Sequence, residues 1–286
     1  LFKSVRESAF GDRMKFFVGG GALLGIDLQK YYYAIGVPIF QGYGLSEATP
    51  IISANSTEHH ILGSSGMVVR PMEIKICDTD GKALPYGQKG EIVIKGENVM
   101  AGYWKNPKAT AETVVDGWLH TGDMGYMLDD TYLYVTGRFK SLLISSDGEK
   151  YSPEGIEEAL VANSKYISQV VLHDNQDPYV ILLMVPNKEA LKAAAGDDKE
   201  AQLKLIQADV DSYRKGGKHA GQFPEKWLPA AVVVCEEPFT EKNGLVNSTA
   251  KVVRGKVEKY FEKRIEYAYT PEGKQLVNPQ NLSALN

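Results

Sequence analysis

A glycine-rich loop at residues 41–50 combines three side chains that suit a nucleotide. Tyr43 can stack on a base, Ser46 can hydrogen-bond a phosphate, and Glu47 can bind Mg²⁺, which prefers oxygen ligands. A β-turn with a capping serine is the structural alternative. The loop also approaches the G-x-S-x-G elbow of serine hydrolases, but Ala48 replaces the second glycine and argues against that class.

Two further features could contact the rest of such a ligand. The glycines of the segment 19–25 fit the pattern G-x-G-x-x-x-G. Glycines there could let a ligand approach the backbone closely, or they could serve only to pack a helix tightly on a strand. Asp123 and Arg138 each lie near an expected turn. The Asp123 carboxylate could accept hydrogen bonds from the two hydroxyls of a ribose, and the Arg138 guanidinium could donate to them. A structural salt bridge between the two residues is the alternative.

The elements that must position these residues change character along the chain. The pattern is first α/β, with a short strand that starts near residue 14 and runs into the glycine turn, a helix over 26–35 and a strand over 37–40. From about residue 72 it becomes β-rich, and the turn residues predict strands over 73–77, 91–95 and 132–136.

The second half of the chain predicts a compact α+β lobe. Ser152 is expected to cap a helix that has Pro153 at its first position. Strands are expected over 169–173, 179–185 and 230–235, and helices over 188–213 and 250–265. The polar stretch from about residue 267 is expected to be loosely held.

The motifs occur in an order typical of one family. They are Tyr-Gly-Leu-Ser-Glu at 43–47, Gly-Glu-Ile at 90–92, Gly-Tyr-Trp at 102–104, Thr-Gly-Asp at 121–123 and Gly-Arg-Phe-Lys at 137–140. The series resembles that of the AMP-forming adenylating enzymes, which include acyl-CoA synthetases, luciferases and peptide-synthetase adenylation domains. The resemblance implies the end of a large AMP-binding domain over 1–139, with an α/β piece and a β-rich, barrel-like subdomain. A small mobile α+β lobe over 140–286 would follow.

The resemblance also implies a role for each candidate residue. An ATP or AMP site would use Gly20, Gly21 and Ala22 beside the adenine, Tyr43 against its ring, Ser46 at the phosphate, Glu47 at Mg²⁺, and Asp123 and Arg138 at the ribose. In the second lobe, Lys140 would be the hinge, the loop of Asp147, Gly148 and Glu149 would line the tunnel for the CoA thiol, and Lys251 would be the catalytic lysine. A lysine there places a cation where charge develops on the carboxylate and the α-phosphate, whereas a solvated helix lysine is the alternative.

Two segments, 144–153 and 243–245, resemble the long-chain branch of the family. They imply a long-chain-fatty-acid CoA ligase that uses ATP, Mg²⁺, a fatty acid and CoA. It would form acyl-adenylate and pyrophosphate, and then acyl-CoA and AMP. The chain starts with Leu rather than Met and lacks the family's phosphate loop, so we expect a fragment that is inactive without the N-terminal part of its parent chain. An adenylating enzyme for another carboxylate, a non-catalytic nucleotide-binding or interaction module, and an oxidoreductase built on the glycine turn stay open as alternatives.

The amino-acid composition further narrows the possible classes of protein. Apolar residues make up 43% and charged residues 24%, and the net charge of −4 provides no global attraction for nucleic acid. The longest apolar run, 179–185, is far below the ~20 residues of a transmembrane helix, and two distant cysteines favour a reducing cytoplasm. The histidines and cysteines lack zinc-site spacing. The basic cluster at 214–219 could contact CoA phosphates or the surface of a membrane, or be a solvated loop.

Overall fold

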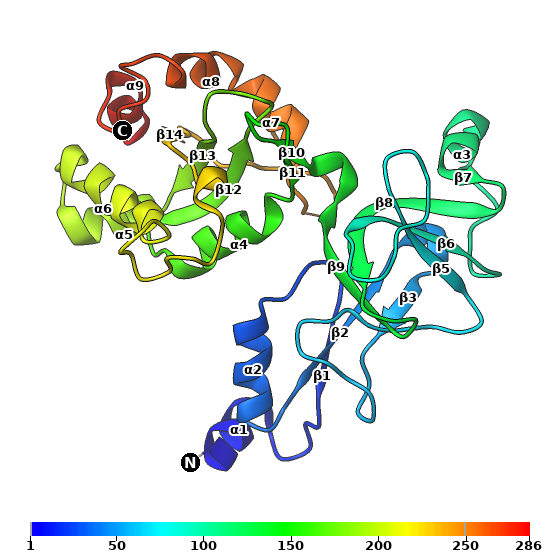
Figure 1. Cartoon of the computed structure of the whole chain (residues 1–286). Helices are drawn as coiled ribbons and strands as arrows, with labels where there is room; N and C mark the ends of the chain where they lie inside the picture. The colour runs from blue at the N-terminus through cyan, green and yellow to red at the C-terminus, as the bar shows by residue number, and fades with distance from the viewer. Residues whose placement is uncertain (1, 249) are drawn as a thin grey trace. The chain divides into compact units, whose positions relative to one another are not determined.

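The computed structural model describes residues 2–248 and 250–286. The chain divides into two compact units, Leu1–Lys140 and Ser141–Asn286. Figure 1 colours the first from blue to green and the second from green to red. Each unit has its own sheets and its own hydrophobic core.

Among the described residues of the N-terminal unit, nine strands form one sheet, in the order β1-β2-β3-β4-β9-β8-β6-β5 with β7 beside β8. The strands are β1 (Phe17–Gly19), β2 (Ile39–Gly44), β3 (Ile51–Ala54), β4 (Gly66–Val68), β5 (Glu73–Cys77), β6 (Gly90–Lys95), β7 (Val114–Val115), β8 (Trp118–Met127) and β9 (Tyr132–Arg138). Only β1 and β2 pair in parallel in this part of the chain. The sheet stays open, so the barrel-like shape expected of the β-rich part is wrong for the strands described.

The helices of this unit are short and flank the sheet. They are α1 (Phe2–Phe10), α2 (Ile26–Ala34) and α3 (Pro107–Thr113), with 3-10 turns η1 (Ser46–Ala48) and η2 (Phe139–Ser141). The α/β start and the β-rich continuation are confirmed. The core lies under β6, where Ile92, Val93 and Ile94 are all fully buried, as expected for an inner strand of an open sheet covered on both faces.

The C-terminal unit places a three-stranded sheet between two groups of helices (Figure 1). The strands are β12 (Ile167–His173), β13 (Ile181–Pro186) and β14 (Ala231–Val234), and a small hairpin joins β10 (Leu143–Ile144) to β11 (Lys150–Tyr151). The helices are α4 (Glu154–Asn163), α5 (Lys188–Ala195), α6 (Lys199–Asp211), α7 (Arg254–Tyr260), α8 (Glu262–Ala268) and α9 (Pro279–Ala284), with the 3-10 turn η3 (Glu225–Trp227).

The middle strand β13 explains why this lobe is compact. Leu182 and Met184 point into the core shared with α4, α5 and α6, whereas Ile181 and Leu183 point into the core shared with α7 and α8. Successive side chains of a strand face opposite sides, so an unbroken apolar run is what a strand covered on both faces requires. No helix in residues 2–248 and 250–286 has the length and apolar character that crossing a membrane requires.

Three expectations for this lobe are wrong in detail. The Ser152 hydroxyl does not cap α4: it is buried and has no hydrogen-bond partner among the described atoms, and Pro153 is the cap residue. The helical stretch 188–213 is two helices because Gly196 adopts φ 60° and breaks it. The expected helix 250–265 starts only at Arg254, after a β-bridge between Val246 and Val252, and breaks at Phe261 into α7 and α8.

The polar end of the chain is docked rather than loosely held. The Asn281 amide donates to Val232 O at 2.9 Å, and its carbonyl accepts from Val234 N at 3.0 Å. These bonds satisfy the outer edge of β14, which would otherwise leave unpaired backbone groups. Asn278 caps α9 by accepting from Asn281 N at 2.9 Å.

Candidate functional site

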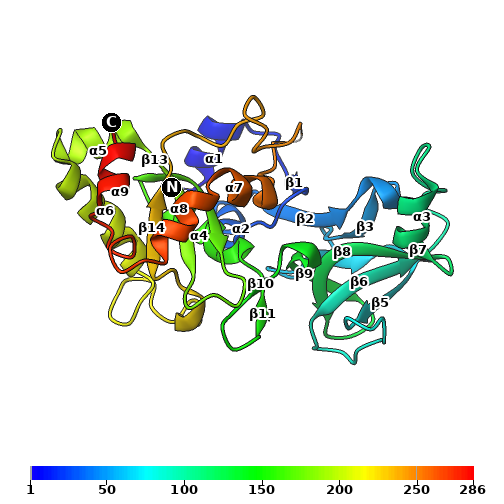
Figure 2. The same ribbon diagram turned by 90° about the horizontal axis from the view of Figure 1, so that it is seen from above.

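The predicted ribose pair lies on two adjacent strands. Strands β8 and β9 lie side by side (Figure 2) and are antiparallel. Their register sets Asp123 directly opposite Arg138. The expectation of a nearby turn is wrong for Asp123, which lies inside β8, and is confirmed for Arg138, which ends β9 directly before η2. Arg138 Nε lies 3.5 Å from Asp123 Oδ1, and the Arg138 side chain is 59% exposed. A ligand could therefore reach the guanidinium from solvent.

Tyr43 joins this pair from β2. Its hydroxyl donates a hydrogen bond to Asp123 Oδ2 at 2.7 Å. Burial, and then the negative charge of Asp123, raise the pKa of Tyr43 far above its usual value, so the phenol stays protonated and remains a donor. The Asp123 side chain is only 14% exposed.

The glycine turn lies beside the same strand. β1 runs parallel to β2 with Gly19 opposite Gln41, so the turn that follows β1 and the residues that end β2 meet at one edge of the sheet. The Gln41 side chain donates to Ala22 O at 3.1 Å and fixes the turn. A Cβ on Gly20 would lie 3.6 Å from Gly42 O, and Gly21 has φ +83°, a conformation that favours glycine.

Glu47 lies in η1 and is held by a residue to which sequence analysis assigned no role. The Tyr103 hydroxyl donates to Glu47 Oε1 at 2.9 Å. Tyr103 belongs to the quoted Gly-Tyr-Trp motif, and that motif was the only signal for it in the sequence. The neighbouring Ser46 is exposed.

Glu47 is the carboxylate of the predicted metal position. Among the described residues, no group of three or more His, Cys, Asp or Glu side chains could hold a metal ion. Glu47 therefore fits Mg²⁺ only as it is usually bound with nucleotides, through one or two carboxylates, substrate phosphates and water.

Lys251 lies at the end of a tight loop before α7. Lys251 N donates to Asn247 Oδ1 at 2.9 Å, and Asn247 N donates to Lys251 O at 2.9 Å. Ala250 has φ 59° at the tip of this loop. The Lys251 side chain is exposed and lies on this loop rather than on a helix face, and its catalytic role stays a prediction.

Three residues farther on, Arg254 ties α7 to α4. Its Nη2 lies 2.8 Å and 3.0 Å from the two carboxylate oxygens of Glu157. Glu157 also accepts from Leu172 N at 2.6 Å, and Arg254 donates to Leu172 O. Burial is the largest influence on Glu157 and raises its pKa, against the opposing effect of Arg254.

The predicted thiol-tunnel loop is the turn between β10 and β11. Asp147 Oδ1 accepts from Glu149 N at 3.2 Å and also from the Ser145 hydroxyl. Gly148 has φ +83° and open space around its α-carbon. Lys226, which sequence analysis missed, forms ion pairs with both Asp147 and Glu149. Nothing in the local sequence marks Lys226, because the fold alone brings it to this turn.

The structure thus brings Tyr43, Asp123 and Arg138 together in the N-terminal unit and leaves the glycine turn on the adjoining strand. Lys140 is the last residue of that unit, and its role as a hinge stays a prediction. Lys251 and the Asp147–Glu149 turn belong to the C-terminal unit.

Comparisons with known proteins cover most of the chain. Residues 2–104 match the family model described as AMP-binding enzyme, and residues 140–273 match the AMP-binding enzyme C-terminal domain. Probable acyl-activating enzyme 16 of Arabidopsis thaliana is 34% identical over 272 residues, which cover 88% of this chain and 37% of that protein. Long-chain-fatty-acid–CoA ligase FadD15 of Mycobacterium tuberculosis is 30% identical over 282 residues, or 95% of this chain and 44% of that protein.

A solved structure supports the same fold. The adenylation domain of a carboxylate reductase from Mycobacterium chelonae superposes with a TM-score of 0.77 at 26% sequence identity. The match covers 94% of this chain and 40% of that one. The chain therefore spans less than half the length of each of these proteins.

Proposed function

Because the chain belongs to the family of AMP-binding, adenylate-forming enzymes, we propose that it is the C-terminal part of an ATP-dependent long-chain-fatty-acid CoA ligase. The observation that carries the proposal is the Tyr43–Asp123–Arg138 cluster, in which a largely covered carboxylate lies between a phenol donor and an accessible guanidinium. Such a set suits the two hydroxyls of a ribose.

In the proposed first half-reaction, a carboxylate oxygen of the fatty acid attacks the α-phosphorus of ATP. The bond between the α-phosphorus and the oxygen that bridges to the β-phosphorus breaks, and pyrophosphate leaves. Asp123 and Arg138 hold the ribose, Tyr43 lies against the adenine with the turn of Gly20, Gly21 and Ala22 on its other side, and Ser46 contacts the phosphate. Glu47 would hold the Mg²⁺ that accompanies the triphosphate. Lys251 would stabilise the charge on the reacting oxygens, for which its exposed position on a tight loop is suited.

In the second half-reaction, the thiolate of CoA attacks the acyl carbonyl, and AMP leaves with the electron pair of the carbonyl–oxygen bond. We propose that rotation at Lys140 withdraws Lys251 and presents the Asp147–Glu149 turn to the thiol. One lobe would thereby serve both half-reactions. The exposed Gly148 at the tip of the turn leaves the backbone accessible to a narrow pantetheine chain.

One alternative has an observation in its favour. The Mycobacterium chelonae neighbour is an adenylation domain of a carboxylate reductase, not of a CoA ligase. The same adenylating machinery can therefore serve another carboxylate or another second step.

The test is pyrophosphate and AMP release by the full-length protein that contains this chain, with acetate, octanoate, palmitate and benzoate, each with and without CoA. We expect pyrophosphate release with palmitate and AMP release that requires CoA. Release with benzoate alone would support the alternative, and no release with any carboxylate would overturn the proposed function. The 286-residue chain alone should release no AMP.

A further inference from the structure

One lysine bridges both carboxylates of the Asp147–Glu149 turn. Lys226 Nζ lies 2.8 Å from Asp147 Oδ2 and also pairs with a carboxylate oxygen of Glu149. Two carboxylates on neighbouring sides of a tight turn repel each other and favour an open loop. A single ammonium between them removes that repulsion. The pairing lowers the pKa of Asp147 and raises the pKa of Lys226, in agreement with the geometry.

The next residue holds the base of the same hairpin. The Trp227 ring stacks on Tyr151 with 4.8 Å between ring centroids and 5° between planes. Tyr151 ends β11, is only 3% exposed, and its hydroxyl donates to Asp174 Oδ2 at 2.9 Å. The turn η3 (Glu225–Trp227) therefore contacts the hairpin at its charged tip through Lys226 and at its buried base through Trp227.

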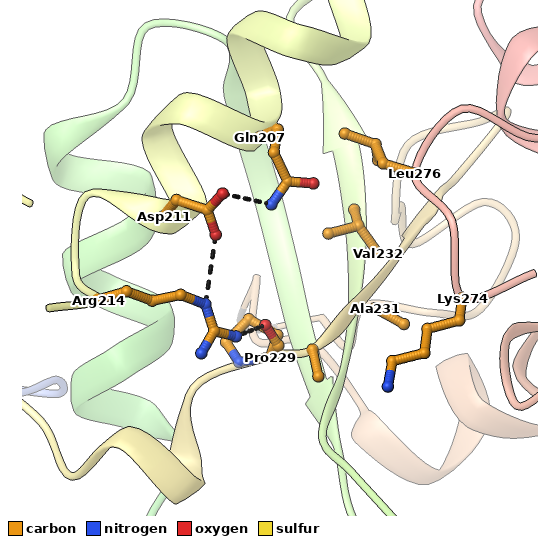
Figure 3. A pocket seen from close by; sticks show the side chains of 9 residues that line it. Gln207, Asp211, Arg214, Pro229, Ala231, Val232, Lys274 and Leu276 are labelled. Atoms are coloured by element: carbon orange, nitrogen blue, oxygen red, sulfur yellow. Dashed lines mark hydrogen bonds and ion pairs between the residues drawn. The ribbon is translucent and has the colours of Figure 1, made fainter.

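The segment that carries η3 is itself braced. Arg214, just after α6, donates through Nη2 to Pro229 O at 2.5 Å and pairs through Nε with Asp211 at 3.3 Å (Figure 3). These contacts close the base of the loop 214–229, beside a cavity of about 290 Å³. The Tyr213 ring contacts His219 within the loop. Arg214 of the basic cluster is thus engaged inside the protein.

We propose that η3 is a clamp and that Lys226 is a positioning residue that holds the Asp147–Glu149 turn in the shape needed for thioester formation. The functional part rests on the proposed function, whereas the positioning part stands on these contacts alone. The three charged side chains are 44–56% exposed. The clamp should therefore bias the turn toward one shape by a few-fold rather than lock it, and salt should weaken it.

Hydrogen exchange of the 286-residue chain tests the positioning part. Glu149 N donates to Asp147 Oδ1, and Gly148 N donates to Ser145 O, so both amides report on the turn. Lys226→Met should raise their exchange rates about two- to five-fold, as expected for an exposed ion-pair network, and Lys226→Arg should restore the wild-type rates. Lys218→Met is the matched control, an exposed lysine of the same loop, and should change neither rate. Unchanged exchange in Lys226→Met would overturn the clamp.

The second arm measures the two half-reactions of the full-length protein separately. In Lys226→Met, thioester formation from supplied acyl-adenylate should fall about two- to five-fold, while pyrophosphate release in the absence of CoA stays at the wild-type rate. Lys226→Arg should recover thioester formation. Equal loss in both half-reactions, or faster exchange with undiminished thioester formation, would refute the role of the clamp in thioester formation. If the wild-type protein forms no acyl-adenylate, the proposed function fails and the exchange result alone decides the clamp.

Discussion

Replacing Arg254 with Met should strongly destabilise the C-terminal unit. The side chains of Arg254 and Glu157 are 18% and 14% exposed, and Arg254 Nη2 lies 2.8 Å and 3.0 Å from the two carboxylate oxygens. Arg254→Met leaves the Glu157 carboxylate buried without its cation. Breaking a buried pair in this way costs about 3–5 kcal/mol of unfolding free energy, because the desolvated charge stays uncompensated.

The loss of unfolding free energy in Arg254→Met should depend on pH. Burial already raises the pKa of Glu157, and loss of Arg254 would raise it further. A carboxyl group with a raised folded pKa stabilises the fold below its unfolded pKa, and that contribution is lost as pH rises through the folded pKa. The cost of Arg254→Met should therefore be smaller near pH 5 than near pH 8, because Glu157 can accept a proton at the lower pH.

The assay is chemical denaturation with exchange or fluorescence detection specific to residues 141–286, on Arg254→Met, Glu157→Gln and the double variant. The double variant should lose less unfolding free energy than the two single variants lose together, since it leaves no lone charge buried. Lys192→Met is the control: its pair with Asp197 has side chains that are 70% and 88% exposed, and its removal should cost about 0–1 kcal/mol. A cost below about 1 kcal/mol for Arg254→Met, or strict additivity in the double variant, would refute the reasoning.

Two other predictions follow from single side chains. Burial, then the charges of Glu154 and Glu157, raise the pKa of Glu158 to about 7, so its stabilising contribution is present below the unfolded value of 4.5 and is lost as pH rises through 7. Glu158→Gln should flatten the fall of unfolding free energy over that window, and denaturation curves at several pH values that match wild type would contradict this. Asp123→Asn removes the charge opposite Arg138 and should weaken AMP binding by the full-length protein about tenfold or more, measured by calorimetry. Unchanged affinity would exclude Asp123 from the nucleotide site.

Local patterns predicted most of the strands because burial dictates them. The apolar run 179–185 predicts a strand, and the structure has β13 there, covered on both faces. Asp123 and Arg138 could be selected by residue type, but they face each other because of the register between β8 and β9. That register depends on the length of the turn between the strands, which residue types alone do not specify.

Contacts between distant segments were beyond sequence reasoning. Tyr103 reaches Glu47, and Lys226 reaches Asp147, across long stretches of chain that only the folded sheets bring together. The docked end of the chain shows the same limit. Asn281 reads as a solvated residue, yet it supplies the hydrogen bonds that the edge of β14 lacks.

We propose that Lys251 acts in adenylation and not in transfer to the thiol. The most direct measurement compares single-turnover acyl-adenylate formation with thioester formation from supplied acyl-adenylate in the full-length protein and its Lys251→Ala variant. Adenylate formation should fall about 10²–10³-fold, the range for loss of one group that stabilises transition-state charge, while thioester formation stays within a few-fold of wild type. Undiminished adenylate formation, or equal loss of both steps, would contradict the account.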